Sequence, residues 1–390
     1  MNFQPTTLNE RVHSIDILRG FSLLGILLVN MFAFYLPMPH IDLGSWFTEA
    51  PDIIWHQTLD IYVQSSFYPL FSMLFGYGLA MQFMKAETIG SNFYQFGPKR
   101  LIILLIIGLL HAFFIWWGDI LTMYAFCGFF LLLFLRFSGG WLLTFGLIIN
   151  GFMHLFFIAI FALTGMSNME VEAPAVDIVM INDAITAYGV GNWVDAFFQR
   201  LKDLSLQMGV SMWISALTTI LPYMLIGAAA AKWRLIERAK ELKGLWITLA
   251  IVFLVLGILI KSAPYTFTRT YLLDYLKVYV GGPILSVGYI GIMICLCMIP
   301  FIVKILAPLA RAGRMSLSLY IMQSIICTLL FYHFGFSLYG EIDVQTGTLI
   351  AIGIFIVQVI FAELWFIKFK QGPLEWLVKK LIYKTTLSEK

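Results

Sequence analysis

The chain has 390 residues, of which 60% are hydrophobic and 12% are charged, and its mean hydropathy is +0.87. A soluble domain is closer to half apolar and a quarter charged, so this composition excludes a soluble enzyme or binding module and indicates an integral membrane protein. The net charge of +3 gives no reason to expect a nucleic-acid partner.

Apolar runs of about 20 residues predict membrane-spanning helices, since the strands of a barrel are shorter and alternate between apolar and polar residues. We therefore expect an all-α, polytopic helix bundle that forms a single domain over 1–390. The pattern predicts about ten spans, at 15–36, 61–84, 99–117, 119–136, 141–165, 210–232, 244–261, 278–303, 313–333 and 346–368.

Lysine and arginine predict the orientation, because they are enriched in the cytoplasmic loops of membrane proteins. Most of the 25 lysines and arginines fall in one set of alternate loops, which includes Arg11 near one chain end and the lysines after 368 at the other. The first loop of the other set, 37–60, contains neither residue type. We therefore expect both termini in the cytoplasm.

The first span contains three polar residues, Asp16, Arg19 and Asn30, among apolar ones. A charged side chain near the centre of a bilayer costs about 3 kcal/mol on insertion scales, so such residues are usually paired or functional. Asp16 and Arg19 are three residues apart, on one helix face and close enough to pair. Asn30 lies roughly 21 Å further along the axis at 1.5 Å per residue, near the other side of the membrane.

A histidine at the outer mouth of the second span is the first candidate catalytic group. Asp52, His56 and Asp60 are spaced four residues apart, so on a helix they share one face. A carboxylate beside an imidazole orients it and raises its basicity, as a general base requires. The alternative is a solvated polar face at the membrane interface.

Three more polar residues are expected in the same outer leaflet: Asn30 in the first span, His111 in the third, and Asp119 at the tip of the next hairpin. An amide such as that of Asn30 can stabilise a developing oxyanion. Each residue also has a structural alternative: a hydrogen bond between helices for Asn30, a bond to a carbonyl for His111, and capping of the following helix by Asp119.

The largest outer loop, 166–209, contains apolar residues at near-helical spacing. They predict an amphipathic helix that lies on the outer leaflet or, equally, covers the bundle as a soluble lid. The residues are Trp193, Phe197, Phe198, Leu201, Leu204 and Met208.

The ninth span has a polar stripe, so that face should line a cavity or another helix and not lipid. The stripe comprises Ser316, Tyr320, Gln323 and Ser324. Arg311 and Arg314 lie at the cytoplasmic start of the span, and arginine suits bidentate contact with phosphate. The excess of positive charge in inner loops explains these arginines equally well, as it does Lys99 and Arg100.

These residues resemble the transmembrane acyltransferase superfamily, which includes the lysosomal heparan-alpha-glucosaminide N-acetyltransferases, and in particular its bacterial YeiB-like branch. The most specific stretches are Arg11-x-x-Ser14-x-Asp16-x-x-Arg19-Gly20 with Asn30, and Gly313-Arg314-Met-Ser-Leu-Ser-Leu-Tyr320-x-x-Gln323-Ser324. Similar stretches between and after them are Arg100-Leu-Ile, Gly108-Leu-Leu-His111, Gly118-Asp119-Ile-Leu and Gly372-Pro373-Leu-Glu-Trp376.

The resemblance implies a multi-pass protein of the bacterial plasma membrane that takes acetyl-CoA or another acyl-CoA from the cytoplasm. In the lysosomal enzymes a membrane-embedded His and Asn are regarded as catalytic; Asn30 matches that Asn, and His56 precedes Tyr68-Pro69 much as that His precedes Phe-Pro. The expected catalytic set is His56, Asn30, His111 and Asp119. The expected donor-binding set is Arg19, Lys99, Arg100, Arg311, Arg314, Tyr320, Gln323 and Ser324.

The sequence thus predicts a membrane acyltransferase, with acetyl as the expected group and an acceptor at the outer face that is a glycan, a lipid or a small molecule. The alternatives are a multi-span transporter or exporter, and a structural or sensor protein. The expected partners are membrane lipids and acyl-CoA, and a homodimer is left open. The four cysteines show no metal-binding or disulfide spacing.

Overall fold

The computed structural model describes residues 12–171 and 177–383. Arg11, which belongs to the first sequence motif, and the two final lysines lie outside these ranges. Within them the chain forms helices joined by short turns and has no strand, apart from an isolated bridge between Glu170 and Thr270.

Helices of very different lengths form the bundle, and two of them run into π-helical turns, at Thr186–Val190 and Lys277–Gly281. Their bounds are α1 His13–Tyr35, α2 Leu43–Trp46, α3 Ala50–Tyr62, α4 Phe67–Thr88, α5 Gly97–Phe114, α6 Leu121–Phe134, α7 Gly139–Leu163, α8 Ile178–Ile185, α9 Trp193–Gln207, α10 Val210–Thr219, α11 Leu221–Lys232, α12 Lys243–Thr266, α13 Tyr271–Leu276, α14 Gly282–Cys297, α15 Pro300–Ile305, α16 Ala307–Arg314, α17 Ser316–Phe331, α18 Val344–Lys368 and α19 Pro373–Tyr383.

Seven segments of the described chain are long and apolar enough to cross a membrane, and an eighth is a bent pair. They confirm an all-helical, polytopic bundle. The segment expected as one span over 313–333 is two helices, α16 and α17, which meet at 84°. The spans expected at 61–84 and 119–136 fall on α4 and on the 14-residue α6, neither of which is among the seven.

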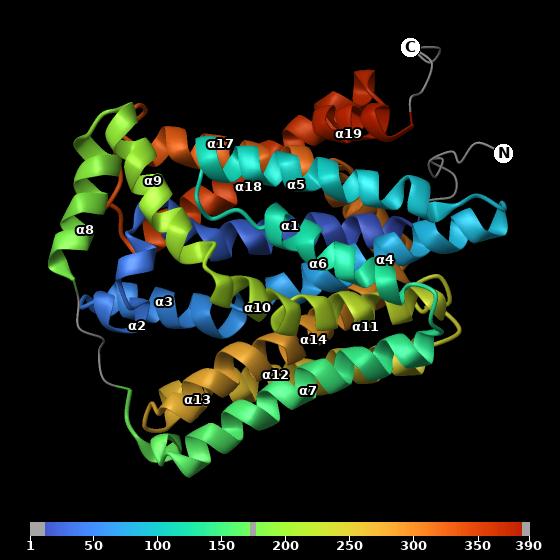
Figure 1. The fold of residues 1–390 in the computed structure, drawn as a ribbon, viewed down its shortest axis with the longest axis horizontal. Coiled ribbons are helices and arrows are strands. Elements are labelled where there is room, and N and C mark those ends of the chain that lie inside the picture. Colours follow the sequence, from blue (N-terminus) through green and yellow to red (C-terminus); the bar gives the residue numbers. More distant parts are fainter. Residues whose placement is uncertain (1–11, 172–176, 384–390) are drawn as a thin grey trace.

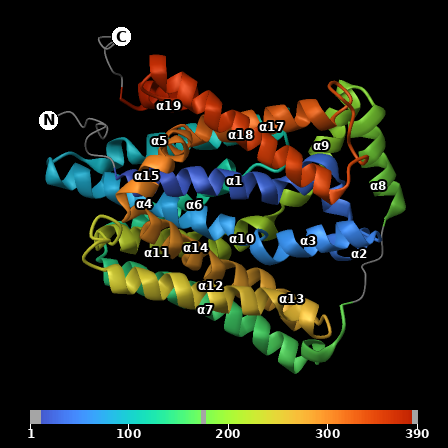
Figure 2. The same ribbon diagram turned by 180° about the vertical axis from the view of Figure 1, so that it is seen from behind.

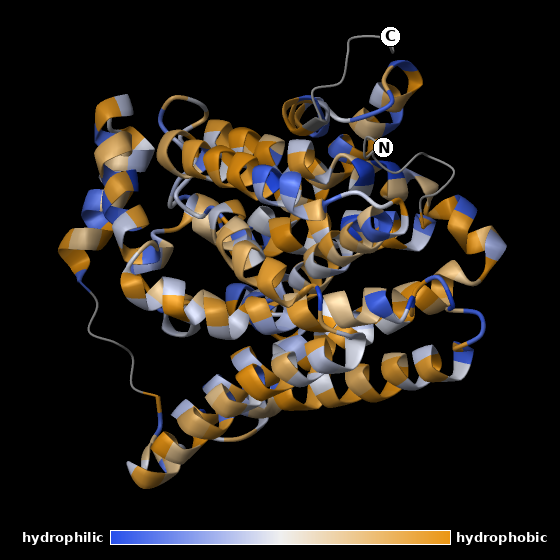
Figure 3. Cartoon of the chain, turned by 45° about the vertical axis from the view of Figure 1, so that its right-hand side comes forward, coloured by the Kyte–Doolittle hydropathy of each residue, from blue (hydrophilic) through white to orange (hydrophobic). Residues whose placement is uncertain are grey.

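The long helices run side by side (Figures 1 and 2). Helices α8 and α9 lie at one end, called here the α9 end, and α19 lies at the opposite, α19 end. Large apolar side chains on α7, α12 and α18 face outward, and the long helices are mostly apolar along their length (Figure 3). This surface suits the hydrocarbon of a bilayer.

Two glycines allow α1 and α16 to cross closely. A Cβ atom on Gly20 would collide with the carbonyl of Leu309, and one on Gly313 would collide with that of Asp16. Small residues permit this close approach of helices in membrane proteins. Since Arg19 and Arg314 are their neighbours in sequence, the crossing also brings these two arginines to one place.

Candidate functional site

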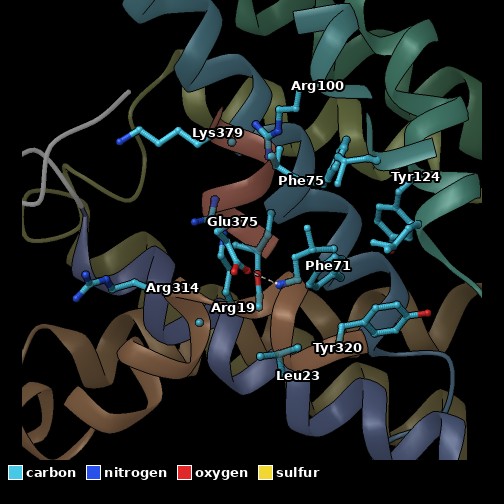
Figure 4. A pocket seen from close by; sticks show the side chains of 18 of the residues that line it. Arg19, Leu23, Phe71, Phe75, Arg100, Tyr124, Arg314, Tyr320, Glu375 and Lys379 are labelled. Atoms are coloured by element: carbon cyan, nitrogen blue, oxygen red, sulfur yellow. Dashed lines mark hydrogen bonds between the residues drawn. The ribbon is translucent and has the colours of Figure 1, made fainter. Parts of the chain in front are cut away.

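A cavity of about 320 Å³ lies between α1, α4, α5, α6, α17 and α19. Its charged lining residues are partly exposed, whereas Tyr124 and Tyr320 in its lining are buried. The cavity is therefore entered from the α19 end and closes in the middle of the bundle. Figure 4 shows the charged side chains on one side and the two tyrosines on the other.

The entrance of the cavity is basic. Arg19, Arg100, Arg314, Lys370 and Lys379 all line it. The Nη1 atom of Arg19 lies 3.2 Å from a carboxylate oxygen of Asp16, as their spacing predicts, so this pair is confirmed. Arg314 donates to the carbonyl of Lys370 at 3.2 Å. Five cationic residues at one opening form a strongly positive entrance, which favours anionic ligands.

Helix α19 forms one side of this entrance and is fixed by Glu375. The carboxylate accepts hydrogen bonds from the backbone N–H of Leu317 at 2.8 Å and of Ser318 at 3.2 Å, and from the Ser318 hydroxyl at 2.6 Å. It therefore caps α17, and this cap accounts for a new helix that begins at Ser316 instead of a straight continuation of α16. Burial raises the pKa of Glu375 above its ordinary value, although these hydrogen bonds lower it.

The inner part of the cavity is apolar up to a pair of tyrosines. Leu23, Ile26 and Leu104 are among its lining residues. The Tyr320 hydroxyl accepts a hydrogen bond from the backbone N–H of Ile120 at 3.2 Å, so its own proton remains to be donated. An apolar channel that ends at a phenol suits a ligand with an apolar stem and one polar atom at its tip.

His111 and Asp119 lie directly behind Tyr320. The His111 ring centroid is 5.2 Å from that of Tyr320, and His111 Nδ1 lies 2.8 Å from Asp119 Oδ2. The other carboxylate oxygen caps α6 by accepting from Thr122 N–H at 2.7 Å. Both residues are almost fully buried, and His111 Nε2 has no hydrogen-bond partner among the described residues. A carboxylate at Nδ1 orients the imidazole and favours the tautomer with its hydrogen on Nδ1, which leaves the Nε2 lone pair without a partner within the described chain.

Beyond the His111–Asp119 pair, helix α9 covers that end of the bundle. It turns a polar face inward, with Gln199, Arg200 and Asp203 buried, while Trp193 and Phe198 are exposed. The apolar periodicity that predicts a helix in 166–209 gave no sign of this buried polar face. The available signal was three polar residues at the spacing i, i+1 and i+4, which share one face of the helix.

His56 lies in a different place, on α3. Its ring packs between Phe32 and Phe47, with centroids 5.8 Å and 5.3 Å away. Asp60, expected to orient it, instead forms an ion pair with Lys277 at 2.7 Å and accepts a hydrogen bond from Tyr265. Burial lowers the pKa of His56, against the opposing effect of Asp60.

Asp52, also expected on the His56 face, caps α18 by accepting from Val344 N–H at 2.8 Å. Asn30 is partly exposed on α1. Neither His56 nor Asn30 is among the described residues that line the cavity. His56 and Asn30 therefore do not belong to this cavity.

The expected donor-binding residues divide in the same way. Arg19, Arg100, Arg314 and Tyr320 line the cavity. The other four residues do not line it. Lys99 is exposed, and Arg311 is ion-paired with Glu363. Gln323 bonds to Gln358 at 3.0 Å and to the carbonyl of Leu23 at 3.4 Å, and Ser324 is buried further along α17. The polar stripe therefore lines the cavity at its start and packs against α1 and α18 further on.

The chain matches known sequences over nearly its full length. A family described as "Protein of unknown function (DUF418)" matches 230–385. "Uncharacterized protein YxaH" of Bacillus subtilis is 34% identical, over 98% of this chain and 96% of its own. "Uncharacterized protein YeiB" of Escherichia coli is 27% identical, over 95% and 96% respectively. An "Uncharacterized 39.9 kDa protein in amylase 3'region" of Bacillus acidopullulyticus is also 27% identical, over 97% and 96%.

Proposed function

From the premise that the chain belongs to the YeiB-like family of bacterial membrane proteins, we propose that it is an acyltransferase that takes its acyl group from acyl-CoA. The observation that carries the proposal is one cavity with a basic entrance, an apolar channel and a tyrosine end wall beside a buried histidine–aspartate pair. Acetyl is the expected acyl group.

In this proposal the phosphates of the donor bind at the entrance. Arg19, Arg100 and Arg314 offer planar guanidinium groups that suit bidentate contact with phosphate oxygens. The pantetheine arm enters the apolar channel and carries the thioester to Tyr320. A cavity of about 320 Å³ is at the small end of the range for ligand pockets, so the nucleotide stays at the entrance.

His111 then acts as the general base. Its Nε2 takes the proton of an acceptor hydroxyl or amine, whose oxygen or nitrogen attacks the thioester carbonyl. As the carbon–sulfur bond breaks, the coenzyme A sulfur leaves and receives the proton from His111. The Tyr320 hydroxyl donates to the oxyanion, because its own oxygen already accepts from Ile120 N–H.

The direction of the reaction follows from the proposed topology. We place ten spans in the plasma membrane with both termini in the cytoplasm, so the α19 end faces the cytoplasm and the α9 end faces outward. Cysteine-accessibility labelling tests this arrangement. A cysteine at position 45 should react only from outside and one at position 238 only from inside, and labelling of both from one side contradicts it.

Binding of acetyl-CoA tests the donor site. Arg314→Ala should weaken binding by roughly 1.5–3 kcal/mol, or about 10- to 150-fold, because it removes a charge-assisted bond. Arg238→Ala is the matched control, since Arg238 is an exposed arginine paired with Glu241 away from the cavity. Isothermal titration calorimetry on protein in nanodiscs measures both. Equal affinity in Arg314→Ala and wild type would refute the donor site.

A further inference from the structure

Arg200 is a buried charge without an obvious partner. It lies on α9 and is 1% exposed. Its Nη1 atom donates to the carbonyl of Phe113 at 3.1 Å, and its Nε atom has no hydrogen-bond partner in the described part of the chain. No described carboxylate lies within ion-pair distance of it. An unpaired buried charge destabilises the fold by several kcal/mol, so a bound anion beside this guanidinium would stabilise it.

The acidic residue closest in sequence, Asp203, does not pair with Arg200. Its Oδ1 atom lies 3.0 Å from His40 Nε2, with which it forms an ion pair when that ring is protonated, and also accepts from Gln199 at 2.9 Å. Its Oδ2 atom accepts from the Tyr188 hydroxyl at 2.7 Å. Both oxygens of Asp203 are therefore engaged by other groups.

A second buried donor, Tyr332, lies near the inward face of α9. The Tyr332 ring stacks on Tyr188 with centroids 4.4 Å apart, and the residue is fully buried. Its hydroxyl has no hydrogen-bond partner among residues 12–171 and 177–383. Tyr188 in turn donates to Asp203, which lies three residues after Arg200 on α9, so Tyr332 lies near the inward face of α9 that also carries Arg200. A guanidinium and a hydroxyl, both able to donate, thus lie on the inward side of α9.

We propose that Arg200 and Tyr332 form a binding site for an anionic group, a carboxylate or a phosphate. A guanidinium pairs with such groups through two parallel hydrogen bonds, and the phenol adds a third. As a site for the acceptor, this inference rests on the proposed acyl transfer. Arg200 bonds to Phe113, two residues after His111, so an acceptor anchored there lies on the opposite side of His111 from the donor cavity.

Helix α9 covers this site, so the ligand enters when α9 moves. Gly191 and Gly209 flank the helix and allow such a movement. The anion has two possible sources. One is the headgroup of an anionic lipid in the outer leaflet, since the exposed aromatic side chains of Trp193 and Phe198 suit a membrane interface. The other is a water-soluble carboxylate or phosphate.

Thermal unfolding of the full-length protein in nanodiscs tests the site without acyl-CoA. In phosphatidylcholine discs at constant ionic strength, inorganic phosphate or succinate at ten times its dissociation constant should raise the midpoint by about 1.5–2 °C. Discs that contain phosphatidylglycerol should give the rise without added anion if a lipid is the source. Arg200→Met should abolish whichever rise occurs.

Two further variants make the result specific. Lys202→Met should keep the full rise, because Lys202 lies on the same helix but is exposed and paired with Asp183. Tyr332→Phe should reduce the rise, and it decides the matter if Arg200→Met does not fold. A rise that is equal in wild type and Arg200→Met, or no rise with phosphate, succinate or phosphatidylglycerol, overturns the proposal. Donor binding at the α19 end is measured separately, so its failure is distinguishable from failure here.

Discussion

Two histidines of this protein each have an aspartate nearby in sequence, yet the structure gives them different surroundings. Asp119 bonds directly to His111, at 2.8 Å, and its other oxygen only caps a helix. Asp60 lies one helical turn from His56 but is engaged by Lys277 and Tyr265. His111 contacts the wall of the cavity, whereas the His56 ring packs between two phenylalanines.

The difference shows that sequence spacing alone does not identify a catalytic pair. At i, i+4 two side chains can meet, but each then takes the best partner in the whole fold. A lysine is a better partner for Asp60 than a neutral imidazole, since an ion pair compensates a buried carboxylate more fully. The pair His111–Asp119 has no such competitor among the described residues, so its aspartate remains available to orient the ring.

The largest effect is expected from Asp119→Asn. The asparagine oxygen can still cap α6, so the fold should survive. His111 loses the carboxylate that orients it and stabilises its protonated form, so the turnover of acyl-CoA should fall by about 10²–10⁴-fold. Release of the coenzyme A thiol, measured with a chromogenic disulfide, reports the rate. A rate within twofold of wild type would show that this pair is structural.

Asp60→Asn should lower the stability of the protein without changing its rate of acyl-CoA turnover. It removes the closer of the two ion-pair partners of Lys277, at 2.7 Å, and leaves Asp274 at 3.3 Å, so the free energy of unfolding should fall by about 1.5–3 kcal/mol. The rate of acyl-CoA turnover per folded molecule should not change. Chemical unfolding in mixed micelles gives the first quantity and thiol release the second. A variant of normal stability but low turnover would make His56–Asp60 the catalytic pair after all.

A smaller effect concerns pH. Burial lowers the pKa of His56 below 6.5, although Asp60 raises it, so below pH 6.5 the folded protein binds fewer protons at this site than the unfolded chain. The contribution of His56 to stability is therefore complete above pH 6.5 and is lost as the pH falls toward the lower pKa of the folded state. The difference in unfolding midpoint between wild type and His56→Phe should change over that interval. A difference that is independent of pH would contradict the assignment.

Local features of the site could be predicted from the sequence. The pair Asp16–Arg19 follows from helical spacing, and the polar start of α17 follows from its stripe. Contacts between distant segments could not be predicted. Glu375 caps α17, a helix that begins 59 residues earlier, and this cap lies at the bend of the expected ninth span. Arg200 donates to a carbonyl of α5. No periodicity within one segment contains this information, because each contact depends on how whole helices pack.

The most direct measurement compares two variants, His111→Gln and His56→Gln, in the release of coenzyme A from acetyl-CoA, with water or an added amine as acceptor. The account predicts that His111→Gln abolishes release while acetyl-CoA still binds, because the histidine acts on the acceptor and not on the nucleotide. His56→Gln should release coenzyme A at the wild-type rate per folded molecule. Loss of release in His56→Gln with retention in His111→Gln, or tight binding without release in the wild type, would contradict it.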